Sequence, residues 1–181
     1  VLAPSKDGFL YAIDRNEGDQ VWRANVGSSV SSPAVHGDTV FVASGSFDGR
    51  RDVQALDIPN GRLRWTFTPN GPVQASITYA DGKIFFSTNA ANGTIYALNA
   101  TRGEEVWKFQ PTPANYILGS PIVADETVYA PSDNGHVYAI RDPARQPPSV
   151  VYSVWAAGVI VLVLVTAGVL AILWRRRRAP D

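Results

Sequence analysis

The chain has 181 residues, a length that suits one domain of ordinary size with a hydrophobic core. It carries 16 basic and 16 acidic residues, and four of the basic ones form the run 175–178, so the rest of the chain is slightly acidic. A nucleic-acid partner is not expected, because phosphate binding needs clustered Lys and Arg. The lack of cysteine excludes disulfides, thiolate catalysis and cysteine-based zinc sites.

The chain opens on Val1 and contains no methionine. We therefore expect its N-terminus to be a fragment end or the product of processing, with any export signal located upstream.

One motif recurs three times along the chain, as AIDRNEGDQVW (12–22), ALDIPNGRLRW (55–65) and ALNATRGEEVW (97–107). Each copy begins with Ala, has Asp or Asn at its third position and Gly at its seventh, and ends with Trp. The segment VLAPSKDGFLYAI (1–13) also aligns without a gap on VYAPSDNGHVYAI (128–140). The chain is therefore a repeat with a period of about 42 residues.

Each period contains four short β-like runs separated by turn formers. In the first complete period these runs are Pro33–His36, Thr39–Ala43, Val53–Asp57 and Leu63–Phe67. Four antiparallel strands in about 42 residues are typical of a β-propeller blade. We therefore predict an all-β domain over residues 1–142, with three strands of a first blade, two complete blades and three strands of a last one, as part of a ring of six to eight blades.

The recurring residues have a structural explanation. The acid or amide ends the third strand, where its side chain can accept hydrogen bonds from the turn backbone. The glycine allows the positive φ that closes the hairpin, and the Trp of the outermost strand can pack on the next blade because the small Ala leaves space. We predict this structural role for Ala12, Asp14, Gly18, Trp22, Ala55, Asp57, Gly61, Trp65, Ala97, Asn99, Gly103 and Trp107.

The A-x-[DN]-x-x-x-G-x-x-x-W pattern resembles the tryptophan-docking motif of pyrroloquinoline-quinone (PQQ) type propeller repeats. The resemblance covers roughly residues 1–142. It implies the fold, and it leaves the activity open, since that superfamily includes quinoprotein alcohol dehydrogenases, a lipoprotein of the outer-membrane assembly machine and many surface proteins.

Quinone-binding members of that superfamily use calcium ligands and a catalytic acid, and no segment of this chain matches them. The two histidines, His36 and His136, occupy different repeat positions and lack clustered carboxylates. We therefore predict no catalytic, cofactor-binding or metal-binding residues, and PQQ and calcium are expected only if the protein is a dehydrogenase.

The composition changes after the last repeat. Residues 143–150 form a Pro-rich linker, and residues 151–174 run without a charge for long enough to cross a bilayer as one helix. Arg175, Arg176, Arg177 and Arg178 follow directly, and such residues favour the cytoplasmic side. We predict a single transmembrane helix, a short cytoplasmic tail over 175–181 and an extracytoplasmic propeller. Sequons at Asn92 and Asn99 are possible glycosylation sites.

The leading hypothesis is a membrane-anchored propeller that acts as a binding or scaffold module, whose partners are the lipid bilayer and a protein or cell-surface ligand. One alternative is a membrane-bound PQQ-dependent dehydrogenase whose active-site residues lie upstream. Another is an extracellular sensor that signals through a partner subunit, because the short tail leaves no room for a cytoplasmic effector.

Overall fold

The computed structural model describes residues 1–45 and 49–141. The predicted linker, the predicted transmembrane helix and the arginine run lie outside these residues. Within the two described ranges, no helix is long and apolar enough to span a bilayer.

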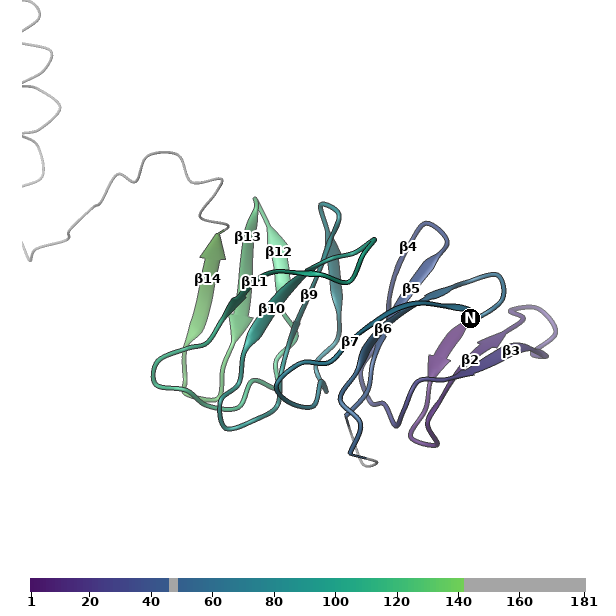
Figure 1. Ribbon diagram of the computed structural model, residues 1–181, viewed down its shortest axis with the longest axis horizontal. Helices are drawn as coiled ribbons and strands as arrows, with labels where there is room; N and C mark the ends of the chain where they lie inside the picture. Colours follow the sequence, from purple (N-terminus) through teal and green to yellow (C-terminus); the bar gives the residue numbers. More distant parts are fainter. Residues whose placement is uncertain (46–48, 142–181) are drawn as a thin grey trace, which may run out of the picture. The chain divides into compact units, whose positions relative to one another are not determined.

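The described residues form β-strands in four antiparallel sheets, which follow one another in chain order (Figure 1). Sheet 1 contains β1 (Leu2–Pro4), β2 (Phe9–Ile13) and β3 (Gln20–Asn25). Sheet 2 contains β4 (Ala34–His36), β5 (Thr39–Ala43), β6 (Val53–Asp57) and β7 (Leu63–Phe67). Sheet 3 contains β8 (Thr78–Ala80), β9 (Lys83–Ser87), β10 (Ile95–Asn99) and β11 (Glu105–Phe109). Sheet 4 contains β12 (Ile122–Ala124), β13 (Thr127–Pro131) and β14 (Val137–Arg141).

The all-β prediction is confirmed, and so are two complete four-stranded sheets flanked by two three-stranded ones. In sheet 2 the predicted strands match the observed ones, except that β4 starts one residue later, at Ala34. Pro33 stays outside because proline has no N–H to donate to a strand ladder. Four-stranded antiparallel sheets in sequence are consistent with a propeller-like fold.

The middle strands of sheets 2 and 3 are buried on both faces. All five residues of β5 are buried, and so are Val53, Gln54, Ala55 and Leu56 of β6. Alternate residues of β6 face opposite neighbours: Val53 and Ala55 belong to the core shared with sheet 3, and Leu56 to the core shared with sheet 1. Each of these two sheets lies between two others, so both faces of its middle strands are covered. The middle strands are therefore mostly continuous apolar runs in the sequence.

The core is divided into three clusters, one between each pair of successive sheets. Leu10 and Val40 belong to the cluster between sheets 1 and 2, and Phe41 and Phe86 to the cluster between sheets 2 and 3. Between sheets 3 and 4, Ile95 packs with Val128, Ala130 and other buried residues. Each sheet is thus held by its immediate neighbours in the chain.

Candidate functional site

The three copies of the recurring motif have the same local backbone. Ala12 lies directly across from Trp22, Ala55 from Trp65, and Ala97 from Trp107. The strand register shifts immediately after each of these alanines. Such a β-bulge bends the outer strand locally and redirects its side chains. The small side chain of each alanine leaves room for the indole ring of the tryptophan opposite.

Two copies of the motif close their turn with the predicted polar side chain. Asp14 Oδ1 accepts hydrogen bonds from the backbone N–H of Asn16 at 2.7 Å and of Glu17 at 3.0 Å. Asn99 Oδ1 accepts from Thr101 at 3.0 Å and Arg102 at 2.9 Å. The hydrogen bonds from Glu17 and Asn16 lower the pKa of Asp14. A neutral amide and a carboxylate thus make the same turn.

The tryptophans join each sheet to the next one. Trp22 Nε1 donates a hydrogen bond to the carbonyl oxygen of Ile58 at 2.7 Å, and Trp65 Nε1 donates to that of Ala100 at 3.0 Å. Each indole also covers the motif glycine of the next sheet. A Cβ atom at Gly61 would lie 2.7 Å from the Trp22 ring, and one at Gly103 would lie 2.5 Å from the Trp65 ring. These glycines have φ angles of 69° and 71°, so both the backbone and the ring contact favour glycine.

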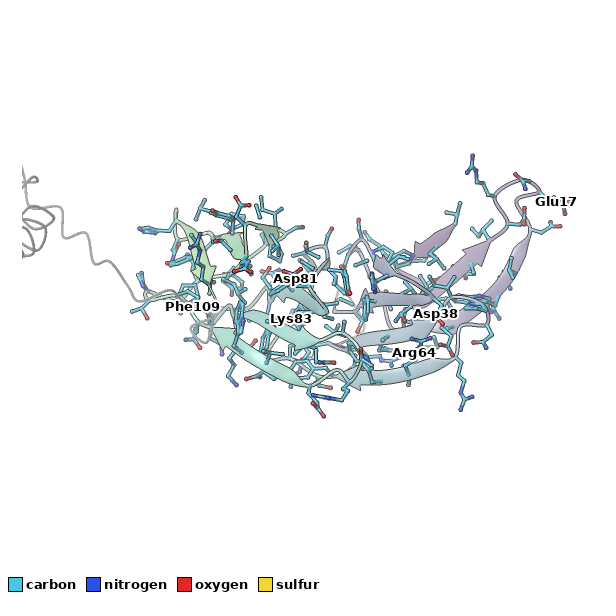
Figure 2. All side chains as sticks on the ribbon, turned by 90° about the horizontal axis from the view of Figure 1, so that it is seen from above. Glu17, Asp38, Arg64, Asp81, Lys83 and Phe109 are labelled. Carbon is cyan, nitrogen blue, oxygen red and sulfur yellow. The ribbon has the colours of Figure 1, made fainter. Side chains whose placement is uncertain are left out.

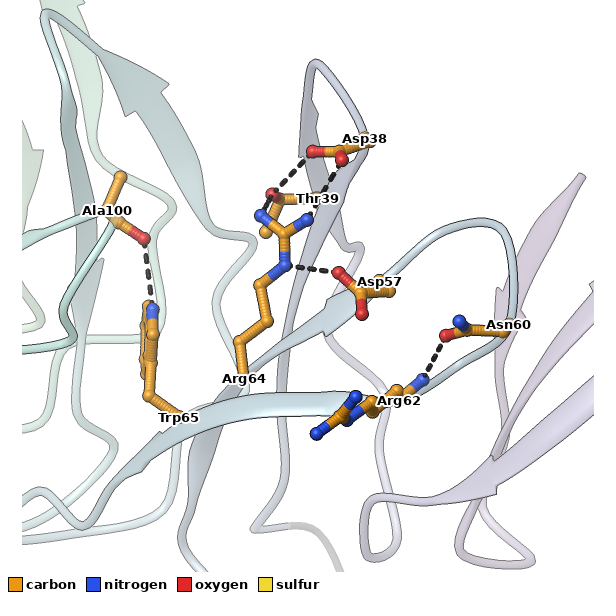
Figure 3. Close-up of polar contacts among 8 residues, drawn as sticks. All are labelled: Asp38, Thr39, Asp57, Asn60, Arg62, Arg64, Trp65 and Ala100. Carbon is orange, nitrogen blue, oxygen red and sulfur yellow. Dashed lines mark hydrogen bonds and ion pairs between the residues drawn. The ribbon is translucent and has the colours of Figure 1, made fainter.

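Asp57, the acid of the second copy, has a different partner. Its carboxylate pairs with Arg64 Nε, and Arg64 also contacts the Thr39 hydroxyl and the Asp38 carboxylate, the latter at 3.0 Å (Figure 3). Figure 2 labels Arg64 and Asp38 on sheet 2, and Figure 3 shows the guanidinium of Arg64 directed at the carboxylate of Asp38. The hydrogen bond and the charge of Arg64 lower the pKa of Asp38, and hydrogen bonds to Asp57 and Asp38 raise that of Arg64. This network stabilises the edge of one sheet, and the repeat pattern did not predict it.

The third tryptophan, Trp107, lies beside a shallow pocket between sheets 3 and 4. Its ring centroid is 5.9 Å from that of Phe85, and Lys83, Asp81 and Glu126 also line the pocket. The described part of the chain contains no group of three or more His, Asp or Glu side chains that could hold a metal ion. His36 stacks on Tyr79 with ring centroids 4.0 Å apart, and His136 immediately precedes β14, beside Tyr138.

The two sequons have different surroundings. Asn92 is exposed in a turn between β9 and β10, and its backbone oxygen accepts hydrogen bonds from Asn70 and Thr94. Asn99 is partly buried, and its side-chain oxygen is engaged in the motif turn. The next residue, Ala100, carries the carbonyl that Trp65 binds.

Three exposed apolar side chains lie in the loops that lead from one sheet to the next. Val30 precedes sheet 2 and is 47% exposed, and Leu118, at the equivalent position before sheet 4, is 49% exposed. Tyr116 is 46% exposed in the same loop as Leu118. Hydrogen bonds connect successive loops, from Ser31 Oγ to the Ala75 carbonyl at 2.7 Å and from the Ser76 N–H to Ser120 Oγ at 2.9 Å.

The family of the chain follows from its sequence as a whole. The family model described as outer membrane protein assembly factor BamB matches residues 6–144. The chain belongs to this family. Sheets 2, 3 and 4, strands β2 and β3 of sheet 1 and all three copies of the motif lie within the matched residues.

Relatives of the chain include enzymes as well as assembly factors. It is 31% identical to tetrathionate hydrolase of Acidithiobacillus ferrooxidans, over 60% of this chain and 26% of that protein. It is 33% identical to a lanthanide-dependent methanol dehydrogenase of Methylacidiphilum fumariolicum, over 53% of this chain and 18% of that one. Among solved structures, BamB from Moraxella catarrhalis matches with a TM-score of 0.62 and 26% identity, over 77% of this chain and 42% of that chain. The chain thus spans less than half the length of each of these proteins.

Proposed function

We propose that this chain is a membrane-anchored, extracytoplasmic propeller that binds a protein partner and acts as a scaffold. The observation that carries the proposal is the family match over residues 6–144, whose description names an assembly factor. Residues 151–174 would form the anchor, with residues 175–178 on the cytoplasmic side. The linker 143–150 would then hold the propeller close to the bilayer.

The four sheets would belong to a ring of six to eight. Propellers close with four to eight blades, and the sheets at both ends of this series expose side chains whose counterparts in sheets 2 and 3 are buried.

The loops that join successive sheets would form the binding surface. Loops at equivalent repeat positions lie at the same end of their sheets. The hydrogen bonds from Ser31 Oγ to the Ala75 carbonyl and from the Ser76 N–H to Ser120 Oγ hold neighbouring loops together. Val30, Tyr116 and Leu118 give this surface two aliphatic side chains and one aromatic ring. Apolar side chains in a polar surround are typical of protein interfaces.

Site-specific crosslinking tests the proposal. A photoreactive amino acid is placed at position 118 of the full chain, and the chain is expressed in the cells that naturally make it. On illumination it should form a defined covalent adduct with one partner protein. The substitution Val30→Asp, made in the same chain, should reduce the adduct about tenfold, since a charge on the surface interrupts apolar contact. Val106 is 44% exposed on β11, away from these loops, so Val106→Asp is the matched control and should leave the adduct unchanged. An adduct that Val30→Asp does not reduce would contradict the proposal, as would the lack of any protein adduct.

A second candidate function is that of a membrane-bound quinoprotein dehydrogenase, which the 33% identity to a methanol dehydrogenase favours. The described residues do not supply the metal-ligand group that such an enzyme needs. The ligands would therefore have to come from residues outside the described ranges. Titration of the protein with PQQ and calcium, followed by absorbance and by dye-linked alcohol oxidation, distinguishes the two functions. Saturable binding with turnover would favour the dehydrogenase.

A further inference from the structure

The two ends of the sheets differ in charge. At one end are the turns that join the first strand of a repeat to the second and the third to the fourth, and many of their residues are charged. These residues are Asp14, Arg15, Glu17, Asp19, Asp38, Arg62, Asp81, Arg102, Glu104, Asp125 and Glu126.

Four loops at the opposite end have no charged residues. Loops 26–33, 68–77 and 110–121 lead from one sheet to the next, and loop 88–94 joins β9 to β10. None of their residues is Asp, Glu, Lys or Arg. We call these four loops together the neutral surface.

The four loops contact one another. Asn70 Nδ2 donates a hydrogen bond to the backbone oxygen of Asn92 at 3.1 Å, which joins loop 68–77 to loop 88–94. Gly93 packs so closely on the next loop that a Cβ atom there would lie 2.3 Å from the carbonyl oxygen of Asn115. The hydrogen bond from Ser31 described above adds the remaining loop. The neutral surface is therefore continuous over three sheet-to-sheet connections.

Amide side chains on this surface have hydrogen-bonding capacity to spare. Asn92 is exposed, and its side chain has no hydrogen-bond partner within residues 1–45 and 49–141. The side-chain oxygens of Gln74 and Asn115 accept from Asn89 Nδ2 and from the Tyr116 N–H, each at 2.8 Å, while their NH₂ groups have no partner within the same ranges. An amide side chain offers the same donor and acceptor as a peptide group, so these residues are suited to bind a main chain.

Apolar side chains lie next to these amides. Tyr116 is 46% exposed and Leu118 is 49% exposed, and Ile117 between them is fully buried and anchors the loop. The nearest charges lie in other loops: Asp52 accepts a hydrogen bond from Thr68 at 2.8 Å, and the Asp133 N–H donates to the Tyr116 carbonyl at 3.1 Å. The neutral surface is thus bordered by charge and free of it inside.

We propose that the neutral surface binds an extended, uncharged segment of the partner protein. The proposal rests on the scaffold function proposed above and specifies the chemistry of the partner. A charged side chain buried here would lose its hydration without an opposite charge to pair with. The peptide groups of a helix are hydrogen-bonded to one another, whereas those of an extended segment can pair with the amides of Asn92, Gln74 and Asn115. Side chains of the segment would pack on Tyr116 and Leu118.

The salt dependence of the adduct formed through position 118 tests the proposal. In membranes isolated from the cells that make the full chain, the yield should change by less than about twofold between low salt and about 1 M NaCl, because contacts between uncharged groups are not screened. A fall of about tenfold would show that charge pairs hold the partner, and would overturn the proposal.

The position of the crosslink on the partner is a second measurement. Digestion of the adduct and mass spectrometry should place it in a stretch of about five residues or more, the length of an ordinary strand, without Asp, Glu, Lys or Arg. A crosslink in a charged stretch or on a glycan would reject the uncharged segment.

Variants that differ by one charge give the sharpest test. Asn92→Asp adds a negative charge with almost no change in size, and it should reduce the adduct about tenfold. Asn92→Gln removes the same sequon but keeps a neutral amide, so its yield should be at least about fivefold above that of Asn92→Asp. Asn16→Asp makes the same change at the charged end, where Asn16 is exposed, and should leave the yield unchanged. Equal losses for Asn92→Asp and Asn92→Gln would contradict the proposal.

The scaffold function and the uncharged segment can fail separately. An adduct that Val30→Asp reduces but that Asn92→Asp does not, or that high salt abolishes, keeps the scaffold function and rejects the uncharged segment. The lack of any protein adduct rejects both.

Discussion

Equivalent residues of sheets 3 and 4 have very different surroundings. Ile95 of β10 and Val137 of β14 occupy the same repeat position on the same face of their sheets, yet Ile95 is fully buried and Val137 is 67% exposed. The sequence around them is alike, and the difference lies in the neighbouring sheet that covers one and is missing from the other among the described residues. Burial here is thus a property of the interface between sheets.

A second comparison concerns sheets 2 and 4, in each of which an arginine contacts the threonine that begins the second strand of the repeat. In sheet 2, Arg64 of the fourth strand reaches the hydroxyl of Thr39. In sheet 4, Arg141 of the third strand donates to the equivalent hydroxyl, that of Thr127, at 2.7 Å. Arg141 stands where Asp57 stands in sheet 2. Sheet 4 therefore places a guanidinium at this threonine without using a fourth strand.

The largest effect is expected from the tryptophan that joins sheets 2 and 3. Trp65→Ala removes the hydrogen bond to Ala100 and leaves a cavity beside Gly103, and we expect a loss of about 3–5 kcal/mol in the free energy of unfolding. Urea denaturation of the full chain measures it. Trp65→Phe should recover part of the loss through ring packing. Equal losses for Ala and Phe would mean that ring packing contributes little.

The two equivalent positions of sheets 3 and 4 should respond unequally. Ile95→Ala should cost about 2–5 kcal/mol because the side chain is fully buried between two sheets. Val137→Ala should change the free energy of unfolding by less than about 0.5 kcal/mol, because the side chain is largely exposed. Urea denaturation compares the two variants. A large loss for Val137→Ala would contradict this exposure.

The motif glycines allow a finer comparison between sheets. Gly103 and Gly18 both have positive φ angles, 71° and 78°, so Ala should cost about 1 kcal/mol at either site. At Gly103 the new Cβ would also meet the Trp65 ring, whereas at Gly18 no atom of the described residues lies within 4 Å. Glu17, beside Gly18, projects from the far end of sheet 1 (Figure 2). We therefore expect Gly103→Ala to lower the thermal midpoint clearly more than Gly18→Ala, and equal shifts would argue that the indole moves aside.

The smallest effect concerns pH and the turn of the first motif copy. Hydrogen bonds from Glu17 and Asn16 lower the pKa of Asp14 in the folded chain. The folded state therefore binds the proton less readily than the unfolded state, and the stabilisation is present above the ordinary Asp pKa and is lost as the pH falls through the lowered value. Asp14→Asn should keep the turn, as Asn99 does, and weaken the decline of the thermal midpoint between about pH 5 and about pH 2. An unchanged decline would assign the acid sensitivity to other carboxylates.

Much of the fold could be predicted from the repeat. The period gave the number and order of the strands, since a turn former stands between each pair of apolar runs, and β6 and β7 begin and end where predicted. The turns of Asp14 and Asn99 were predictable as well, because Asp and Asn side chains commonly accept hydrogen bonds from the backbone N–H two residues on.

Contacts outside the repeat pattern could not be predicted. Asp57 has the same sequence position as Asp14, and it pairs with Arg64 because the second copy has an arginine where the first has Val21 and the third has Val106. The stacking of His36 on Tyr79 joins residues 43 positions apart on the first strands of two sheets, and neither side chain occurs at that position in the other repeats. Such contacts depend on single side chains, and periodicity reports only what recurs.

The hydrogen bonds of Trp22 and Trp65 to the next sheet span 36 and 35 residues, so each reaches only the adjacent repeat. The loop hydrogen bonds from Ser31 to Ala75 and from Ser76 to Ser120 also extend over one repeat, 44 residues each. A duplication or loss of one 42-residue unit would therefore disturb only the contacts at its two boundaries and leave the others intact.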